Sequence, residues 1–252
     1  MFIIPRLFIL IAVCLYFSCI SGPSQAHPQD EDIILDIEQG QLQFDEEKIE
    51  QEYLSALKRQ RMRKVAQMPM FEQISFYIAA GVTHIIPKGL DHILFVLGLF
   101  FSTTLLIPMV WQISAFTLAH TITLGLAIQG LVQVPSNIVE PLIALSIVYI
   151  AYENIRFSEP SKSRLLLIFI FGLLHGLGFA SVLVDYGLPK DSLLTALFAF
   201  NIGVEIGQVL VIAIAAILFF WFFKAKWYRL YTQIPASIVI GSFGIFWLFE
   251  RI

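Results

Sequence analysis

The chain has few charged residues and almost no cysteine. Each shortage excludes some classes of protein or kinds of site. Charged residues make up 14% of its 252 residues, whereas 58% are hydrophobic and the mean hydropathy is +0.78. This composition excludes an ordinary water-soluble globular protein. The net charge of −3, with no basic patch interleaved with aromatic residues, argues against a nucleic-acid partner.

The two cysteines, Cys14 and Cys19, lie in a segment with the features of a signal peptide. Arg6 supplies a positive charge, an apolar core follows over 7–20, and Ser-Gln-Ala at 24–26 matches the small-x-small cleavage pattern. Cleavage after Ala26 would leave no cysteine, and therefore neither a disulfide nor a thiolate metal site. The alternatives are an uncleaved anchor helix and a lipoprotein signal at Cys19.

The sequence predicts three parts: a signal peptide over 1–26, a polar extracytoplasmic region over 27–72, and a polytopic transmembrane domain over 73–252. The polar region holds 11 of the 19 acidic residues. Within it we expect a short strand or hairpin around Gly40, and a helix over 45–66 that is either a solvated tether or lies near lipid headgroups.

The apolar runs of the remaining chain predict an all-α membrane protein, a bundle of about six transmembrane helices. Each run is long enough to cross about 30 Å of hydrocarbon. A shorter apolar run, 73–86, precedes them and is expected to be a membrane-embedded, re-entrant segment. The six predicted spans are 90–107, 111–132, 138–155, 164–184, 193–223 and 235–250.

Basic residues in two loops predict the orientation. One loop carries Arg156, Lys162 and Arg164, and the other carries Lys224, Lys226 and Arg229. Two spans separate these loops, so both lie on one side, which the positive-inside rule makes cytoplasmic. We therefore expect a multi-pass protein of the inner (plasma) membrane with an extracytoplasmic N-terminal region. The basic run KRQRMRK at 58–64 opposes this orientation.

Ionisable and amide side chains within the apolar runs predict a site for a divalent transition metal. In lipid such residues usually face the bundle interior and mark an ion path. Imidazole and carboxylate ligands suit Ni, Co, Cu or Zn. From their positions in the spans we expect a descending chain of ligands, from the outer edge to the middle of the membrane. The candidate metal ligands are His84, Asp91, His92, His120, Glu140, His175, Asn201 and Glu205.

Each candidate also has an ordinary structural reading. A lone membrane histidine is more often an interhelical hydrogen-bonding group, and His84 could lie in a loop near Pro87. We expect Glu153 to be an interfacial residue paired with Arg156. His27 would become the N-terminus after cleavage, where it could chelate Cu(II) or Ni(II) or simply be exposed. The glycine pairs 172/176 and 203/207 have the G-x-x-x-G spacing that lets helices approach closely.

Several motifs, in order, resemble the HupE/UreJ family of membrane proteins associated with nickel supply to hydrogenase and urease. They are HIIPKGLDHILFVLGLF, AFTLAHTITLGLA, IVEPLIALSIVYIAYEN, FGLLHGLGFASVL and FNIGVEIGQ. The resemblance implies a metal permease with about six spans. The chain resembles a divergent branch: six residues, rather than five, separate His84 from Asp91, and only one His-Gly pair, at 175–176, stands in the fourth span.

We therefore expect a permease for a divalent transition metal, Ni or Co by the resemblance, rather than an enzyme. The metal ion, as substrate, and the lipid bilayer are the expected partners. Two alternatives stay open. A metal held by the same residues could activate water in an intramembrane hydrolase, or the protein could be a non-transporting accessory that works with a metalloenzyme-maturation partner. The sequence has no ATP-binding motif, which leaves facilitated diffusion or coupling to the membrane potential.

Overall fold

A computed structural model describes residues 47–103, 105–161, 163–185 and 192–252. The predicted signal peptide, both cysteines, His27 and the expected strand around Gly40 lie outside these residues. The chain divides into two units, Met1–Leu57 and Lys58–Ile252. The described part of the first unit is the beginning of helix α3 (Glu47–Ala66), which occupies most of the predicted 45–66 helix and continues into the second unit.

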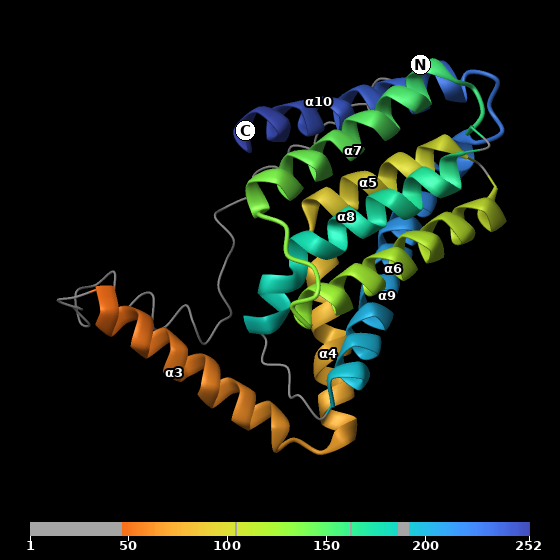
Figure 1. The fold of residues 1–252 in the computed structure, drawn as a ribbon. Helices are drawn as coiled ribbons and strands as arrows, with labels where there is room; N and C mark the ends of the chain where they lie inside the picture. The colour runs from red at the N-terminus through yellow and green to blue at the C-terminus, as the bar shows by residue number, and fades with distance from the viewer. Residues whose placement is uncertain (1–46, 104, 162, 186–191) are drawn as a thin grey trace, which may run out of the picture. The chain divides into compact units, whose positions relative to one another are not determined.

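The second unit is built from helices, and the described residues contain no strand, which confirms the predicted all-α fold class (Figure 1). A 3-10 turn at Phe220–Phe222 follows the longest helix, and a π turn at Arg229–Gln233 leads into the last one. In chain order the helices are α4 (Met70–Ile85), α5 (Leu90–Ser102), α6 (Leu106–Ile128), α7 (Ser136–Arg156), α8 (Arg164–Asp185), α9 (Leu193–Phe219) and α10 (Ile234–Glu250).

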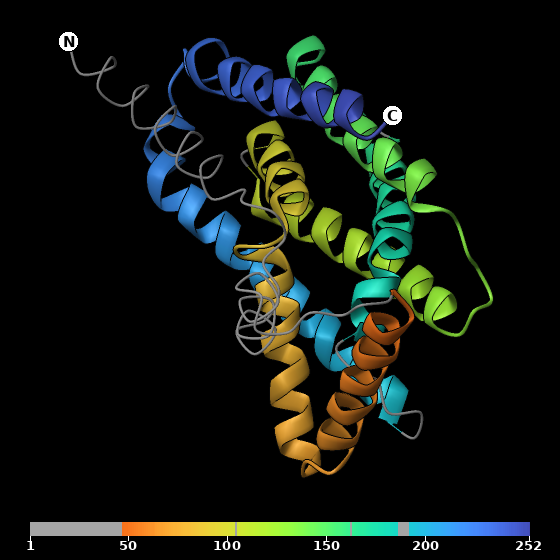
Figure 2. The same ribbon diagram turned by 90° about the vertical axis from the view of Figure 1, so that its left-hand side faces the viewer.

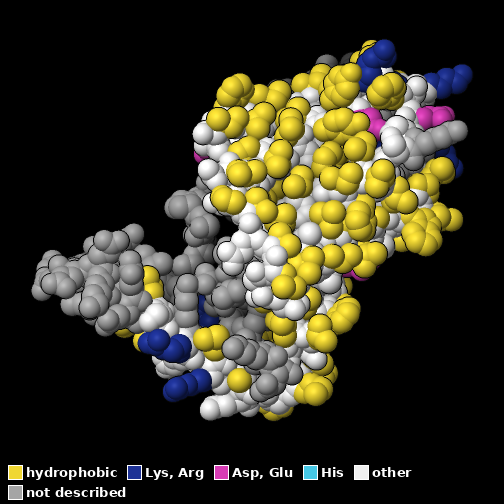
Figure 3. Space-filling model, viewed as in Figure 1, with side chains coloured by type: hydrophobic (Ala, Val, Ile, Leu, Met, Phe, Trp, Pro, Cys, Tyr) yellow, Lys and Arg dark blue, Asp and Glu magenta, His cyan; other side chains and the backbone are white. Residues whose placement is uncertain are grey.

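The length and apolar character of these helices make this a multi-pass membrane protein. Four segments of the described chain are long and apolar enough to cross a bilayer: Ile107–Ile128, Ser136–Arg156, Leu193–Phe219 and Arg229–Glu250. The pair α4 and α5 supplies a fifth crossing if it is counted as one broken span, and Arg164–Phe179 is a shorter apolar helix. Figure 3 shows the matching surface, on which hydrophobic side chains cover most of the described face and charged side chains lie toward its edges.

The first predicted span, 90–107, differs from the structure. Helix α5 ends at Ser102 and has 13 residues, or about 20 Å, which is too short to cross the hydrocarbon alone. It meets α4 at an angle of 72° (Figure 2). Pro87 and Gly89 lie in the four-residue break. Pro87 has no N–H to continue a helix, and a Cβ on Gly89 would meet the backbone carbonyl of His84. The residues at this break explain the bend.

Glycine pairs hold two helix pairs close together, as their spacing predicts. On α8, a Cβ at Gly172 or Gly176 would collide with the backbone carbonyls of Phe116 and His120 on α6. On α9, a Cβ at Gly203 would lie 2.9 Å from the Cα of Gly81 on α4. Only glycine permits backbones this close. The two contacts therefore hold α8 against α6 and α9 against α4.

Candidate metal centre

Four histidines from four different helices meet inside the bundle. His84 lies in the last turn of α4 and His92 in the first turn of α5, so the bend between these helices brings both to the same place. His120 comes from α6 and His175 from α8, the pair that the glycines hold together. All four are buried, with exposed fractions of 8%, 3%, 0% and 1% in chain order.

The distances among His84, His92 and His120 suit a shared metal ion, and His175 lies beside them. One ring nitrogen each of His84, His92 and His120 lie within 4.8 Å of one another. His175 joins them through His92, whose ring centroid is 4.9 Å away. Metal–imidazole bonds of about 2.0–2.1 Å place two ligands of one ion up to about 4.2 Å apart. Small side-chain rotations would therefore complete such a site.

Three of the rings have a hydrogen-bond partner at Nδ1, and all four histidines leave Nε2 available. Nδ1 of His92 donates to Asp91 Oδ1 at 2.9 Å, and Nδ1 of His175 donates to the Phe171 carbonyl at 2.8 Å. Nδ1 of His120 lies 3.2 Å from Asn201 Oδ1. Nε2 of all four histidines is buried and has no hydrogen-bond partner among the described residues. A proton fixed on Nδ1 leaves the Nε2 lone pair free for a metal.

Asp91 and Asn201 contact the Nδ1 atoms of His92 and His120, away from the Nε2 atoms that are left available. The Asn201 amide nitrogen donates to the Leu197 carbonyl at 2.8 Å, which turns the amide oxygen toward His120. The Asp91 carboxylate also accepts the His92 backbone N–H at 2.8 Å. Metal-binding histidines commonly have such an oxygen partner on the far nitrogen. In the structure Asp91 and Asn201 therefore lie on the Nδ1 side of the His92 and His120 rings, where they can orient these rings.

Aromatic rings surround the cluster. Phe179 packs on His84 with 3.7 Å between ring centroids, and Phe116 lies 4.9 Å from His175 and 5.8 Å from His92. Phe95 lies 5.5 Å from His175. These apolar walls exclude water, and electrostatic interactions strengthen in such surroundings. Sequence reasoning missed this shell, because the phenylalanines look like ordinary core residues in an apolar helix.

Polar contacts between α6 and α9 continue beyond the cluster. Ser114 donates to Glu205 Oε1 at 3.2 Å, and Thr117 donates to Gln208 Oε1 at 3.0 Å. Polar side chains of the two helices therefore meet. Thr121 donates to the Thr117 carbonyl of its own helix.

The carboxylates Glu140 and Glu205 are not brought to the histidines. Glu140 is 50% exposed, and its nearest charged neighbour is Arg251, at 3.9 Å. Neither carboxylate forms an ion pair with a histidine in the described part of the chain. The expected descending chain of ligands is therefore wrong in its arrangement, because the α4–α5 bend gathers the histidines into one cluster.

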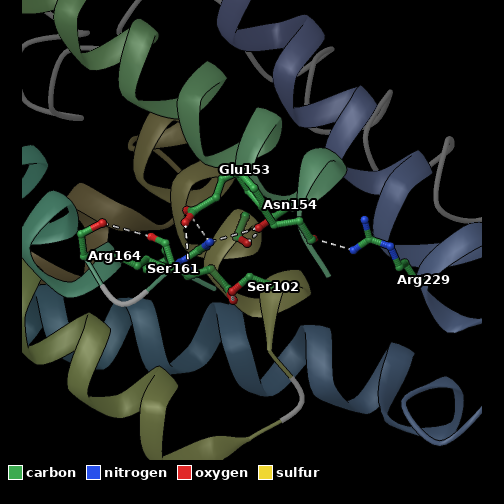
Figure 4. Close-up of polar contacts among 10 residues, drawn as sticks. Ser102, Glu153, Asn154, Ser161, Arg164 and Arg229 are labelled. Carbon is green, nitrogen blue, oxygen red and sulfur yellow. Dashed lines mark hydrogen bonds and ion pairs between the residues drawn. The ribbon is translucent and has the colours of Figure 1, made fainter. Parts of the chain in front are cut away.

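The predicted pairing of Glu153 with Arg156 is also wrong. Glu153 pairs with Arg164 at 2.7 Å, and both side chains are buried (Figure 4). Arg156 instead lies over the Phe157 ring, 5.5 Å from its centroid. Arg156 is one turn from Glu153 in sequence, but Glu153 faces the bundle interior and Arg156 is exposed.

Comparison with known proteins gives one match. The family model described as HupE / UreJ protein matches residues 59–251. No curated protein and no solved structure matches the chain. The matched range covers the four histidines and every helix from α4 to α10. The chain is a multi-pass membrane protein that belongs to the HupE/UreJ family.

Proposed function

We propose that this protein is a membrane permease for a divalent transition metal, which it binds at the four-histidine cluster. The observation that supports this most is the set of four buried Nε2 atoms, contributed by four helices and left without a hydrogen-bond partner in the described part of the chain. A buried unpaired polar atom is costly. Four of them at one place are most simply explained by a ligand that accepts all four lone pairs.

The ligand chemistry supports a borderline metal as the substrate. Imidazole suits Ni, Co, Cu and Zn, whereas Mg and Ca prefer oxygen. Within this group we propose Ni or Co, in keeping with the family resemblance.

Asp91 gives the proposed permease an entrance. Its side chain is 23% exposed, whereas His92 beside it is 4% exposed. A cation attracted by this carboxylate would lie next to the first histidine of the cluster. In the proposed topology this entrance faces outward, because the basic loops around Arg156 and Lys226 are cytoplasmic. From the cluster the ion would continue past Asn201 and Glu205 along α9.

Metal flux into vesicles tests this function. Purified protein should carry Ni²⁺ or Co²⁺ into liposomes that contain a metal-sensitive dye. His92→Ala and His175→Ala should abolish the flux, because each removes one of four ligands. Glu140→Gln is the matched control, since Glu140 is half exposed and pairs with Arg251 rather than with a histidine, and it should retain full flux. Undiminished flux in both histidine variants would refute the proposal.

The aromatic enclosure supports a second candidate, an accessory protein that keeps one metal ion resident. A single enclosed cluster, in place of a string of sites, is also what a stored ion requires. The rate of metal exchange separates the two candidates. A permease must exchange its metal as fast as it transports, whereas an accessory protein would retain a stoichiometric ion for hours in the presence of a chelator and would carry no flux.

A further inference from the structure

A separate cavity of about 800 Å³ lies at the end of the bundle where α5, α7 and α9 end and where α6 and α8 begin. None of the four histidines lines it. Three basic residues do: Arg164, Lys226 and Arg229. Glu159 is the one acidic residue in its described lining. The charge of the walls therefore favours an anion.

Arg164 has hydrogen-bond donors that the described protein does not use. It is the first residue of α8, and its side chain is 2% exposed. Nη1 donates to Glu153 at 2.7 Å and to Asn154 at 3.3 Å (Figure 4). Nε and Nη2 have no acceptor among the described residues. Guanidinium carries five N–H donors, so three of them are free to bind an anion.

The surroundings of Arg164 hold it in place. Glu153 accepts the Ser161 backbone N–H at 3.2 Å, and the Asn154 amide donates to the Gly98 carbonyl at 2.8 Å. Arg229 donates to the carbonyls of Ile155 and Phe157, which ties the next loop to the end of α7. The N-terminal end of α8 adds the partial positive charge of the helix dipole. The donors are therefore preorganised.

The same cavity has apolar walls that face outward. Trp111 is 66% exposed and Leu105 is 64% exposed, and both belong to its lining. A small inorganic anion would leave these walls uncovered. An anion with a hydrocarbon chain would fill them.

We propose that this cavity binds the phosphate group of an acidic phospholipid. The phosphate oxygens accept hydrogen bonds from Arg164 and Lys226, and an acyl chain lies along Trp111 and Leu105. Phosphate is a common partner of arginine, because the planar guanidinium matches two of its oxygens. Basic pockets between transmembrane helices bind such headgroups in other membrane proteins.

Native mass spectrometry of the full chain in detergent tests the proposal. Phosphatidylglycerol should bind with a stoichiometry of one, and phosphatidylcholine with the same acyl chains should bind at least tenfold more weakly. Lys226→Gln should weaken phosphatidylglycerol binding about fivefold, and Arg164→Gln more strongly. Lys224→Gln is the matched control, since it removes an exposed charge from the same loop without touching the cavity lining, and it should bind normally.

Three results would overturn the proposal. One is equal binding of the two lipids, and another is equal binding by the Lys226→Gln and Lys224→Gln variants. The third is displacement of phosphatidylglycerol by inorganic phosphate at similar concentration, which would make free phosphate the ligand. If Arg164→Gln does not fold, Lys226→Gln still decides the outcome. Metal binding should be unchanged in all lysine variants, so the result is independent of the proposed metal transport.

Discussion

The replacement Asn201→Leu tests how the cluster is built. Leucine has the same branched skeleton of heavy atoms as asparagine but is bulkier and cannot accept a hydrogen bond. The change therefore removes the acceptor that lies 3.2 Å from His120 Nδ1 and leaves the four Nε2 ligands in place. Asn201 is 5% exposed, so water does not readily replace the lost oxygen.

The structure sets the expected size of the effect. Without the acceptor, His120 must bind metal with its Nδ1–H buried and unpaired, which costs about 1–3 kcal/mol. In the metal-free variant the ring can carry its proton on Nε2 instead, on the side of the cluster where the unprotonated Nε2 atoms of the other histidines can accept it. The difference weakens metal binding about 5- to 150-fold, which agrees with the roughly 10- to 100-fold loss typical when a histidine's supporting partner is removed.

Titration of the detergent-purified protein with Ni²⁺ against a competing chelator measures this affinity. Gln208→Leu is the matched control, because it removes another buried amide from α9, bonded to Thr117 and to no histidine. We expect its affinity to stay within twofold of the unchanged protein. Equal affinities for Asn201→Leu and Gln208→Leu would refute the role assigned to Asn201.

Three further predictions concern other parts of the structure. Asp91→Asn should weaken metal binding about tenfold, since it removes the charge that orients His92, and chelator competition against the Glu140→Gln control measures the change. Gly176→Val should lower the free energy of unfolding by about 1–3 kcal/mol or more, because the valine side chain would collide with the His120 carbonyl. Thermal denaturation in detergent measures this loss of stability. The control is Gly178→Ala on the same helix, which should be nearly neutral because its Cβ would meet the flexible end of Ile143. Glu153→Leu should cost about 3–5 kcal/mol, because it leaves Arg164 buried without its counter-ion, whereas Glu159→Leu at an exposed position should change stability by less than about 0.5 kcal/mol. Similar melting temperatures for these last two variants would contradict the importance of the buried pair.

Composition and residue spacing predict much of this fold. Long apolar runs must form helices in lipid, because no water is available for their backbone groups. From residue 111 onward, the apolar runs therefore predict the bounds of the membrane helices to within a few residues. The G-x-x-x-G pairs predict close helix contacts for a similar local reason.

The arrangement of the site could not be predicted in the same way. Depth along straight spans separates His92 from His175, and only the 72° bend at Pro87 and Gly89 brings them together. The direction of a bend depends on what packs against it, here Gly203 and Gly207 of α9, and no local pattern encodes that. The pairing of Glu153 with Arg164, rather than with Arg156, likewise depends on how the loop between α7 and α8 folds back.

X-ray absorption at the metal edge of the purified, Ni²⁺-loaded protein tests the central claim most directly. A four-histidine site predicts a first shell of four nitrogen ligands at about 2.0–2.1 Å, with the outer-shell scattering of imidazole rings, and one fewer imidazole in His120→Ala. A shell dominated by oxygen, or a spectrum unchanged in His120→Ala, would contradict it.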